Sequence, residues 1–270
     1  MTAMFFKLIS VFKNWKGIVI SQLLNREMEP VLKLRNGIQF YTNKNILDVV
    51  VILENFAGAN DHDYFKIVNL SRKPIIIDIG AHIGTFSVNA AKKYPQARIF
   101  SFEPDELNYD KLIKNIKVNN VQNVVPYHKA VGTTNGTILL YSNNYGNFGT
   151  CSSSSITTGP RSIEVPSITL ENIFKENQIE ECDLLKMDCE GGEYDIILRS
   201  NEDVFKKIRT IALEYHIIEE HKVEDIVSFL KNNGYQILLR ENKFNNNFGF
   251  IYANKYSELK KSSLTFDRNK

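Results

Sequence analysis

Cysteine is scarce in this chain of 270 residues. The three cysteines, Cys151, Cys182 and Cys189, are odd in number and lack the short paired spacings of a metal site. This pattern excludes a disulfide-stapled scaffold and a zinc ribbon. We therefore expect reduced thiols in a cytoplasmic protein.

A large excess of charge of either sign is also missing. The chain has 33 basic and 31 acidic side chains, which gives a formal net charge of +2. Proteins that bind nucleic acid through its phosphates carry a strongly basic face. The near-neutral balance therefore argues against a nucleic-acid partner.

No apolar run has the form of a membrane span. The most apolar stretch, residues 4–24, is interrupted by Lys7, Lys13 and Lys16. A spanning helix needs ~20 mostly apolar residues, and a secretory signal needs an unbroken apolar core with a small-residue cleavage site. Two interpretations stay open: an amphipathic helix packed on the domain, or a helix lying in a membrane interface, where lysines sit beside aromatic side chains.

The hydrophobic content of 43% allows one well-packed core. We expect an N-terminal cap at residues 1–70, one α/β domain at 71–254 and a polar tail at 255–270. In the cap, 31–35 and 38–41 read as a β-hairpin whose Asn36-Gly37 pair suits a type I′ turn. A helical pattern follows at 46–56.

Strand and helix patterns alternate in the main domain. Strands are expected at 75–79, 98–102, 124–128, within 179–187 and at 208–215, and helices at 85–93, 105–119 and 223–233. An added strand at 137–141 and a hairpin of 236–239 with 248–252 complete the pattern. Such alternation predicts a doubly wound, mostly parallel sheet. The antiparallel terminal pair is what a class I methyltransferase fold adds to a plain Rossmann sheet.

A polar run at 142–162 separates two strands of this pattern. Loops of this length inside a compact domain are lids, binding loops or disordered segments. A lid over the substrate and plain disorder both stay open.

The chain is organised around the strand at 75–79, which carries Asp78 and breaks at Gly80 and Gly84 before a helix. Such a turn lies at the carboxyl edge of an open α/β sheet, where ligands bind. Gly80 permits close backbone approach, and Gly84 lets the helix pack closely. Asp78 points to a positively charged ligand such as S-adenosylmethionine. The spacing is not the dinucleotide Gly-x-Gly-x-x-Gly pattern, and an ordinary turn after a buried strand is the alternative.

A second acid follows the next strand. Glu103 lies roughly 20 residues after the glycine turn, a spacing that places a carboxylate where it accepts hydrogen bonds from ribose hydroxyls. A solvated helix-capping glutamate is the alternative. Ala130, at the end of the third strand, is placed by topology to flank an adenine.

Three acids follow the fourth strand: Asp188, Glu190 and Glu193, with two glycines between the last two. Clustered carboxylates raise one another's pKa unless a cation or hydrogen bonds compensate. We assign function to Asp188 and Glu190, whereas Glu193 is also explained as an acid at the N-terminus of the next helix.

The fifth strand ends in Glu214 and His216, which share one face by strand periodicity and should lie near Asp188. A histidine beside acids is a reasonable general base. The same group could hold a divalent metal, and a structural histidine satisfied by a neighbouring acid is the third interpretation.

Together these residues resemble the FkbM-type methyltransferases, over about residues 31–253. The resemblance rests on 77–84, 102–104, 112–120, 130–132, 185–193 and 213–216. The Asp-x-Glu-Gly-x-Glu element that begins at Asp188 is its most specific part. His82 stands where family members commonly have Asn, so the polar contact of this turn to the cofactor is expected to differ.

The resemblance implies a class I fold that binds S-adenosylmethionine and methylates a hydroxyl, often on sugars or polyketides. The expected cofactor-binding residues are Asp78, Gly80, Ala81, His82, Gly84, Glu103, Pro104, Ala130 and Asp188. The expected catalytic residues are Asp188, His216, Glu190, Glu193 and Glu214. Asp188 and His216 would act as the general base or as an orienting pair. Glu190 and Glu193 would position the acceptor or the loop. No metal is expected, and metal assistance is a minor alternative.

The expected reaction is an in-line attack of an acceptor hydroxyl on the sulfonium methyl group. The acceptor is expected to be a glycan, a lipid-linked glycan or another small hydroxylated molecule. A nucleic-acid methyltransferase would carry an Asn/Asp-Pro-Pro-aromatic element or a Pro-Cys nucleophile, which are missing. A nicotinamide-binding protein and a non-catalytic scaffold with this fold are the remaining alternatives.

Overall fold

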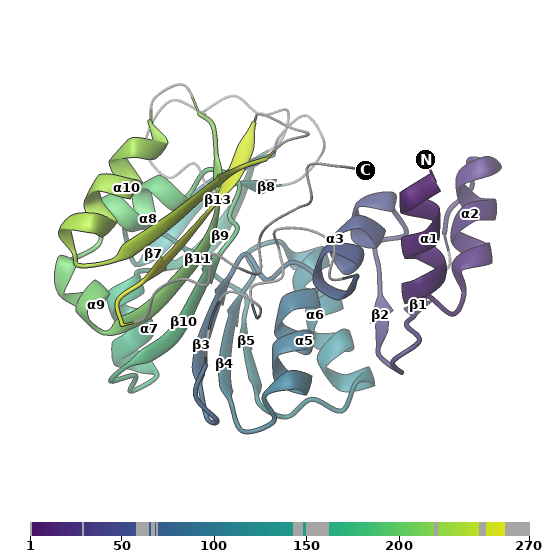
Figure 1. Cartoon of the computed structure of the whole chain (residues 1–270), viewed down its shortest axis with the longest axis horizontal. Coiled ribbons are helices and arrows are strands. Elements are labelled where there is room, and N and C mark those ends of the chain that lie inside the picture. The colour runs from purple at the N-terminus through teal and green to yellow at the C-terminus, as the bar shows by residue number, and fades with distance from the viewer. Residues whose placement is uncertain are drawn as a thin grey trace, which may run out of the picture.

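The β-branched runs of the sequence form the central sheet of the computed structural model (Figure 1). Within the described residues, seven strands lie in the order β12-β13-β11-β10-β3-β4-β5. Their bounds are β3 Ile75–Ile79, β4 Arg98–Phe102, β5 Val124–Tyr127, β10 Cys182–Met187, β11 Ile208–His216, β12 Gln236–Glu241 and β13 Phe248–Asn254. Strands β5, β4, β3, β10 and β11 are parallel, and β13 lies antiparallel between β11 and β12. The predicted fold class is confirmed.

The structure describes residues 2–28, 30–57, 65, 68, 70–142, 148–149, 162–218, 221–242 and 247–256. Most of the polar 142–162 segment, for which a lid and disorder were both predicted, lies outside these residues. So does most of the polar tail.

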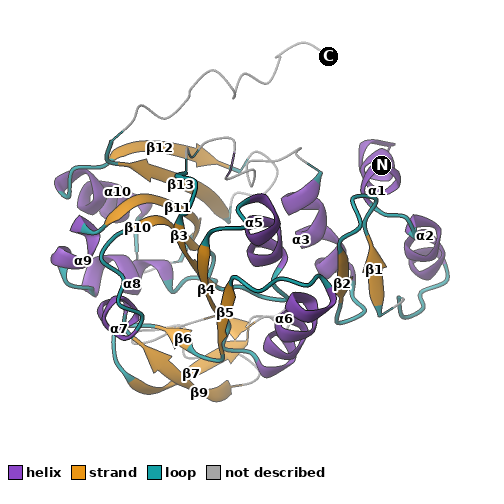
Figure 2. Ribbon diagram, turned by 90° about the horizontal axis from the view of Figure 1, so that it is seen from below, coloured by secondary structure: helices purple, strands orange, loops and turns teal. Residues whose placement is uncertain are grey.

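Helices cover both faces of the sheet (Figure 2). Their bounds are α5 Thr85–Lys93, α6 Glu106–Val118, α7 Leu170–Glu176, α8 Glu193–Arg199, α9 Glu202–Lys206 and α10 Val223–Asn232. Successive strand residues point to opposite faces, so Ile76 belongs to the core beneath α5 and α6, whereas Ile77 belongs to the core beneath α7 to α10. Because both faces are buried, the inner strands are mostly apolar, and the charged Asp78 and Lys186 are exceptions.

A second sheet was only partly predicted. It has the order β6-β9-β7-β8, with bounds β6 Ala130–Val131, β7 Gly136–Ser142, β8 Phe148–Gly149 and β9 Ser162–Ile168. The added strand predicted at 137–141 is β7. Strand β9 was missed because Pro166, in a Ser-flanked stretch, argues against a strand.

The N-terminal cap contains α1 Thr2–Val11, α2 Trp15–Leu23, β1 Val31–Lys33, β2 Gln39–Tyr41 and α3 Ile46–Phe56. The prediction of one helix over 4–24 is wrong, because the chain leaves the helix at Phe12 and pairs with the hairpin. Phe12 forms a β-bridge with Leu34, and the N–H of Lys13 donates to the carbonyl oxygen of Lys33 at 2.7 Å. Within the described part of the chain, no helix is long and apolar enough to cross a bilayer.

The hairpin turn also differs from the prediction. A type I′ turn requires positive φ at both central residues. Here Gly37 has φ +93°, whereas Asn36 keeps a negative φ and accepts a hydrogen bond from the N–H of Ile38 through its side chain. The N–H of Gly37 donates to Leu34, so the loop is a type I turn followed by a left-handed glycine.

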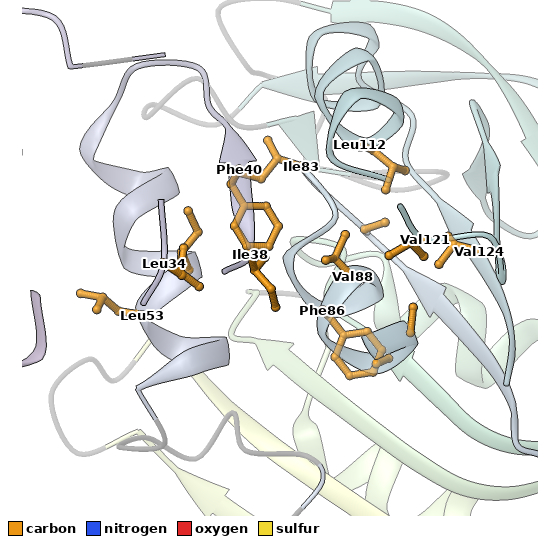
Figure 3. Packing of buried hydrophobic residues seen from close by; sticks show 14 of the residues in the cluster. Leu34, Ile38, Phe40, Leu53, Ile83, Phe86, Val88, Leu112, Val121 and Val124 are labelled. Atoms are coloured by element: carbon orange, nitrogen blue, oxygen red, sulfur yellow. The ribbon is translucent and has the colours of Figure 1, made fainter. Parts of the chain in front are cut away.

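The cap shares its core with the main sheet. Figure 3 shows Phe40 of the cap in the same cluster as Ile83, within the glycine turn, and Val88 of α5. Two buried asparagines at the end of α6, Asn115 and the C-cap residue Asn119, reinforce this contact. Asn115 bonds to both backbone groups of Tyr41, and Asn119 bonds to both of Gln39. The Asn-rich end of this helix therefore fastens the hairpin to the domain.

Candidate active site

A cavity of about 690 Å³ opens at the carboxyl edge of the sheet. Its volume is in the range of roughly 300–1,000 Å³ that small-molecule sites occupy. The wall combines the turn after β3, the end of β4, residues 129–131, the turn after β10 and Glu214. The cap closes the remaining side with residues from the 42–55 segment.

The glycine turn lies against the turn after β10. Gly80 has φ +73°, and a Cβ on it would lie 1.8 Å from the carbonyl oxygen of Asp188. The N–H groups of Gly80 and Ala81 both donate to the carbonyl oxygen of Phe102 at 3.0 Å. A side chain at position 80 would therefore push the two turns apart. Gly80 and Ala81 lie on the cavity wall, as predicted cofactor-binding residues should.

Asp78 and Gly84 do not reach the cavity wall, which corrects the placement expected from the sequence. Asp78 is fully buried, and the cation that it faces is Lys186, whose Nζ lies 3.1 Å away. The hydroxyl of Ser87 donates to its other oxygen. A Cβ on Gly84 would lie 2.5 Å from Leu112, so this glycine serves the packing of α5 on α6.

His82 occupies the turn in a left-handed conformation with φ +51° and lines the cavity. Its Nε2 lies 3.6 Å from Oδ1 of Asp48, a fully buried residue of α3 in the cap. Burial lowers the pKa of His82, and Asp48 opposes this shift. Histidine, like asparagine, tolerates the left-handed region better than most residues. This tolerance fits a histidine at position 82 in place of the expected asparagine.

Glu103 lies at the cavity wall and is 5% exposed. The N–H of His82 donates to its Oε2 at 2.7 Å, and the N–H of Asp105 donates to its Oε1 at 2.9 Å. Burial raises the pKa of Glu103 to about 7, although these two donors act in the opposite direction. The side chain of Asn108 also hydrogen-bonds to this carboxylate. The carboxylate lies on the cavity wall, where it can accept hydrogen bonds from ribose hydroxyls.

Pro104 and Ala130 also line the cavity, next to Glu103 and at the start of β6 respectively. The ring of His128 stacks on Tyr109 at 4.9 Å between centroids, and its Nε2 lies 2.9 Å from the carbonyl oxygen of Pro104. Ala130 pairs with Ser167 of β9 and lies on the cavity wall, where its small side chain could flank an adenine, as the sequence predicts.

Three of the predicted acids meet the cavity at its acidic end: Asp188, Glu190 and Glu214. Glu190 has φ +53°. Burial, reinforced by the charge of Asp188, raises the pKa of Glu214 well above its ordinary value. The structure therefore brings together acids from two neighbouring parallel strands, as their positions in the sequence suggested.

Glu193 lies beneath this acidic end and not on the cavity wall. It is fully buried, and its two oxygens accept hydrogen bonds from the N–H groups of Cys189 and Gly191, both at 2.9 Å. Glu193 thus holds the turn that carries Asp188 and Glu190, which fits the role of positioning the loop that the sequence suggested for it.

His216 is surrounded by acids. Its Nδ1 lies 3.2 Å from Glu193, and its Nε2 lies 3.7 Å from Glu190 and 3.6 Å from Glu214. Burial alone would lower the pKa of His216, but the charge of Glu193 and the hydrogen bond to it, with the other acids, raise the pKa to about 10. An imidazole in this setting is protonated near neutral pH.

Asp188, Glu214 and His216 each offer one ligand atom, and these atoms lie within 4.8 Å of one another. Two carboxylates and one imidazole form a donor set that suits several divalent metals. The arrangement is compatible with the metal alternative, although no metal is expected from the sequence.

Sequence reasoning missed three residues of this site. Lys186 closes the buried pair with Asp78 and donates to the carbonyl oxygen of Gly80 at 2.9 Å. Asp48 and Glu54 belong to the cap, and burial with the charge of Asp188 raises the pKa of Glu54 to about 7. A signal was present: these two acids interrupt an otherwise apolar helix, and Lys186 interrupts an apolar strand.

Three features define a class I S-adenosylmethionine-dependent methyltransferase. They are the parallel sheet with the antiparallel β13 inserted beside its edge strand, the glycine turn after β3 and the acid Glu103 after β4. The profile of the methyltransferase FkbM domain matches residues 78–237. The chain belongs to this family of methyltransferases, and its cofactor is S-adenosylmethionine.

Three relatives illustrate the range of the family. The chain is similar to methyltransferase sdnD of Sordaria araneosa, with 29% identity over 57% of this chain and 70% of that protein. It is 28% identical to the 2-O-methyltransferase NoeI of Sinorhizobium fredii, over 56% of this chain and 67% of that protein. It is 21% identical to the hexuronic acid methyltransferase AglP of Haloferax volcanii, over 61% of this chain and 65% of that protein.

Proposed function

We propose that the chain is an O-methyltransferase that acts on a hydroxyl of a glycan, a lipid-linked glycan or another small hydroxylated acceptor. The observation that carries the proposal is the acidic end of the cavity, where Asp188, Glu190 and Glu214 lie within one wall together with the glycine turn. Carboxylates accept hydrogen bonds from hydroxyl groups, which suits a polyhydroxylated acceptor. The names of AglP and NoeI, a hexuronic acid methyltransferase and a 2-O-methyltransferase, support the same acceptor class.

The residues present fit the cofactor. Glu103 has two oxygens fixed by backbone N–H donors and lines the cavity, where its carboxylate can accept hydrogen bonds from the ribose hydroxyls, and the small Ala130 lines the same cavity. Gly80, Ala81 and His82 form the wall between Glu103 and Asp188. When bound, S-adenosylmethionine supplies a methyl group on a positively charged sulfur, and the acidic end of the cavity offers a negative environment for that charge.

We assign proton removal from the acceptor hydroxyl to Asp188. His216 is the less suitable base, because a pKa of about 10 keeps its ring protonated near neutral pH. His216 instead holds Glu190 and Glu214 in place as a cation, and Glu193 fixes both the histidine and the loop. A positioned general base contributes ~10²–10⁴-fold in rate, whereas alignment of reactants can supply about 7–11 kcal/mol.

Metal assistance is a second version of the mechanism, favoured by the mutual distances of Asp188, Glu214 and His216. Turnover that is unchanged by a chelator would exclude it.

We also propose a cytoplasmic location and no nucleic-acid partner. Within the described residues neither Cys182 nor Cys189 forms a disulfide, and both are buried, as expected in a reducing compartment.

Calorimetry tests the cofactor site. S-adenosylmethionine should bind the wild type, and Glu103→Ala should weaken binding roughly 10–100-fold, because hydrogen bonds to a charged group contribute about 1.5–3 kcal/mol. Glu106→Ala, an exposed acid three positions away, is the matched control and should bind as the wild type does. Equal binding by the wild type and Glu103→Ala, or binding of NAD in place of S-adenosylmethionine, would overturn the assignment.

A screen of hydroxylated acceptors with labelled cofactor tests the reaction. Asp188→Asn should lower kcat by ~10²–10⁴-fold while the variant still binds cofactor. Full cofactor binding without methyl transfer to any glycan, lipid-linked glycan or small hydroxylated acceptor would favour the scaffold alternative.

A further inference from the structure

Two short helices at the N-terminus, α1 and α2, expose large apolar side chains that the core does not use. Leu8, Val11, Phe12 and Ile18 face inward and belong to the core that the cap shares with the sheet. The opposite side of the helices is exposed, with Phe6 at 65% and Leu23 at 78%. We call this side the α1–α2 face and define it by the exposed Met4, Phe5, Phe6, Ile20, Leu23 and Leu24. The half-buried Trp15 packs against the core and borders this face through its contact with Phe5.

Ring contacts join the two helices of this face. The ring of Phe5 packs edge-on against Phe6 at 6.4 Å and against Trp15, the first residue of α2, at 5.6 Å between centroids. The Nζ of Lys16 lies 5.9 Å from the Trp15 ring. On α2 the exposed Ile20, Leu23 and Leu24 are spaced i, i+3 and i+4, so they form one stripe.

The charged side chains within the two helices have one sign, and the first acid after them, the exposed Glu27, forms an ion pair with Lys44. Residues 1–26 contain Lys7, Lys13, Lys16 and Arg26 and no Asp or Glu. The two basic residues that follow along the chain, Lys33 and Arg35, are exposed on the adjoining hairpin, and Arg35 donates to the carbonyl oxygen of Ile9 on α1. A second copy docked on this face would bring two basic segments together, whereas an anionic surface would neutralise them.

We propose that the α1–α2 face is a docking surface for an anionic lipid membrane. Aromatic and leucine side chains enter the interface between headgroups and acyl chains, and the lysines reach the anionic headgroups. The chain then binds as a peripheral protein, since neither helix spans the bilayer.

The surface is linked to the active-site wall. Helix α3 packs against α1 and carries Glu54 on the cavity wall. The charge of Lys7 on α1 acts on that glutamate and opposes the burial that raises its pKa. Lipid bound at the α1–α2 face therefore lies one helix away from the cavity. The docking itself needs neither cofactor nor acceptor, so its test is independent of the proposed reaction.

Trp15 is the only tryptophan of the chain and reports on the face directly. The full chain is mixed with vesicles of phosphatidylcholine alone or with roughly a third phosphatidylglycerol. We expect a blue shift of tryptophan emission and co-sedimentation with the anionic vesicles, both weakened by salt. Phe6→Ser/Leu23→Ser should reduce co-sedimentation at least about tenfold, and Lys13→Glu/Lys16→Glu should do the same.

Leu239→Ser is the matched control, because Leu239 is an exposed leucine on β12 in the main sheet, away from the cap. It should bind vesicles as the wild type does, and unchanged thermal unfolding of the Phe6→Ser/Leu23→Ser variant excludes misfolding. The proposal is overturned if anionic vesicles leave emission and sedimentation unchanged, or if the double variant binds as the wild type does. A concentration-dependent dimer in the absence of lipid, abolished by the same double variant, would assign the face to self-association and would equally overturn it.

Discussion

Lys186 and Asp78 are register partners on the neighbouring strands β10 and β3, and they form an ion pair at 3.1 Å with side chains 6% and 0% exposed. Burial alone would lower the pKa of Lys186, but Asp78 and Asp188 outweigh it and raise the pKa. The pair also fixes the glycine turn, because the same ammonium group donates to the carbonyl oxygen of Gly80.

Removing one partner of this pair should destabilise the fold strongly. Lys186→Met leaves the carboxylate of Asp78 buried without its cation, and such a change costs about 3–5 kcal/mol of unfolding free energy. Denaturant titration measures the loss. Lys206→Met is the control, because its pair with Asp203 is exposed, and no measurable change is expected.

A double-mutant cycle separates the pair from general packing. Asp78→Asn/Lys186→Met removes both charges, so it should lose less stability than the sum of the single variants. Additive losses would show that the two groups act independently.

Close approach of the two turns should make position 80 intolerant of any side chain. Gly80→Ala combines positive φ with a Cβ that would lie 1.8 Å from the carbonyl oxygen of Asp188. Gly234→Ala is the matched control, because Gly234 has φ +83° and nothing within 4 Å of an added Cβ. The control should cost roughly 1–2 kcal/mol, and Gly80→Ala at least ~2 kcal/mol more together with loss of cofactor binding. Similar costs at the two sites would show that the turns can separate freely.

The strands of the main sheet could be predicted because β-branched runs that are buried on both faces carry a strong local signal. The pairing of Asp78 could not be predicted in this way. Its orientation toward a cofactor cation was a sound inference from the strand alone, but Lys186, more than a hundred positions later, occupies the facing register position. The sequence does not show which strands become neighbours.

The contribution of the cap to the site could not be predicted either, because it depends on contacts between segments far apart in the sequence. Asp48 and Glu54 reach the site only because two asparagines at the end of α6 and the shared core dock the hairpin and α3 against the main domain. The clustering of the acids at the ends of β10 and β11 could be predicted from the sequence, because the carboxyl ends of parallel strands meet at one edge of a sheet.

Cofactor affinity should depend on pH through Glu103. Its pKa of about 7 means that the carboxylate, the form that accepts hydrogen bonds from two ribose hydroxyls, is lost as the pH falls below 7. We expect affinity for S-adenosylmethionine to fall up to about tenfold per pH unit below that value, and to level off above pH 8. Calorimetry between pH 5 and 9 measures the dependence, and Glu103→Gln should bind weakly with a flat profile. A flat wild-type profile would contradict the assigned ribose contact.

His216 should remain protonated across the neutral range, because its folded-state pKa of about 10 lies above the ordinary value of about 6.5. A raised pKa means that the stabilisation from the cationic ring is complete below pH 6.5 and is lost as the pH rises toward 10. The difference in unfolding free energy between the wild type and His216→Gln should therefore shrink between pH 6.5 and 10. NMR titration gives the pKa directly, with His216→Gln identifying the signal among the five histidines. Glu193→Gln should lower the midpoint, because it removes the group that raises the pKa of His216 most. A wild-type midpoint near 6.5 would instead make His216 available as a base at neutral pH and would reverse the roles assigned to it and Asp188.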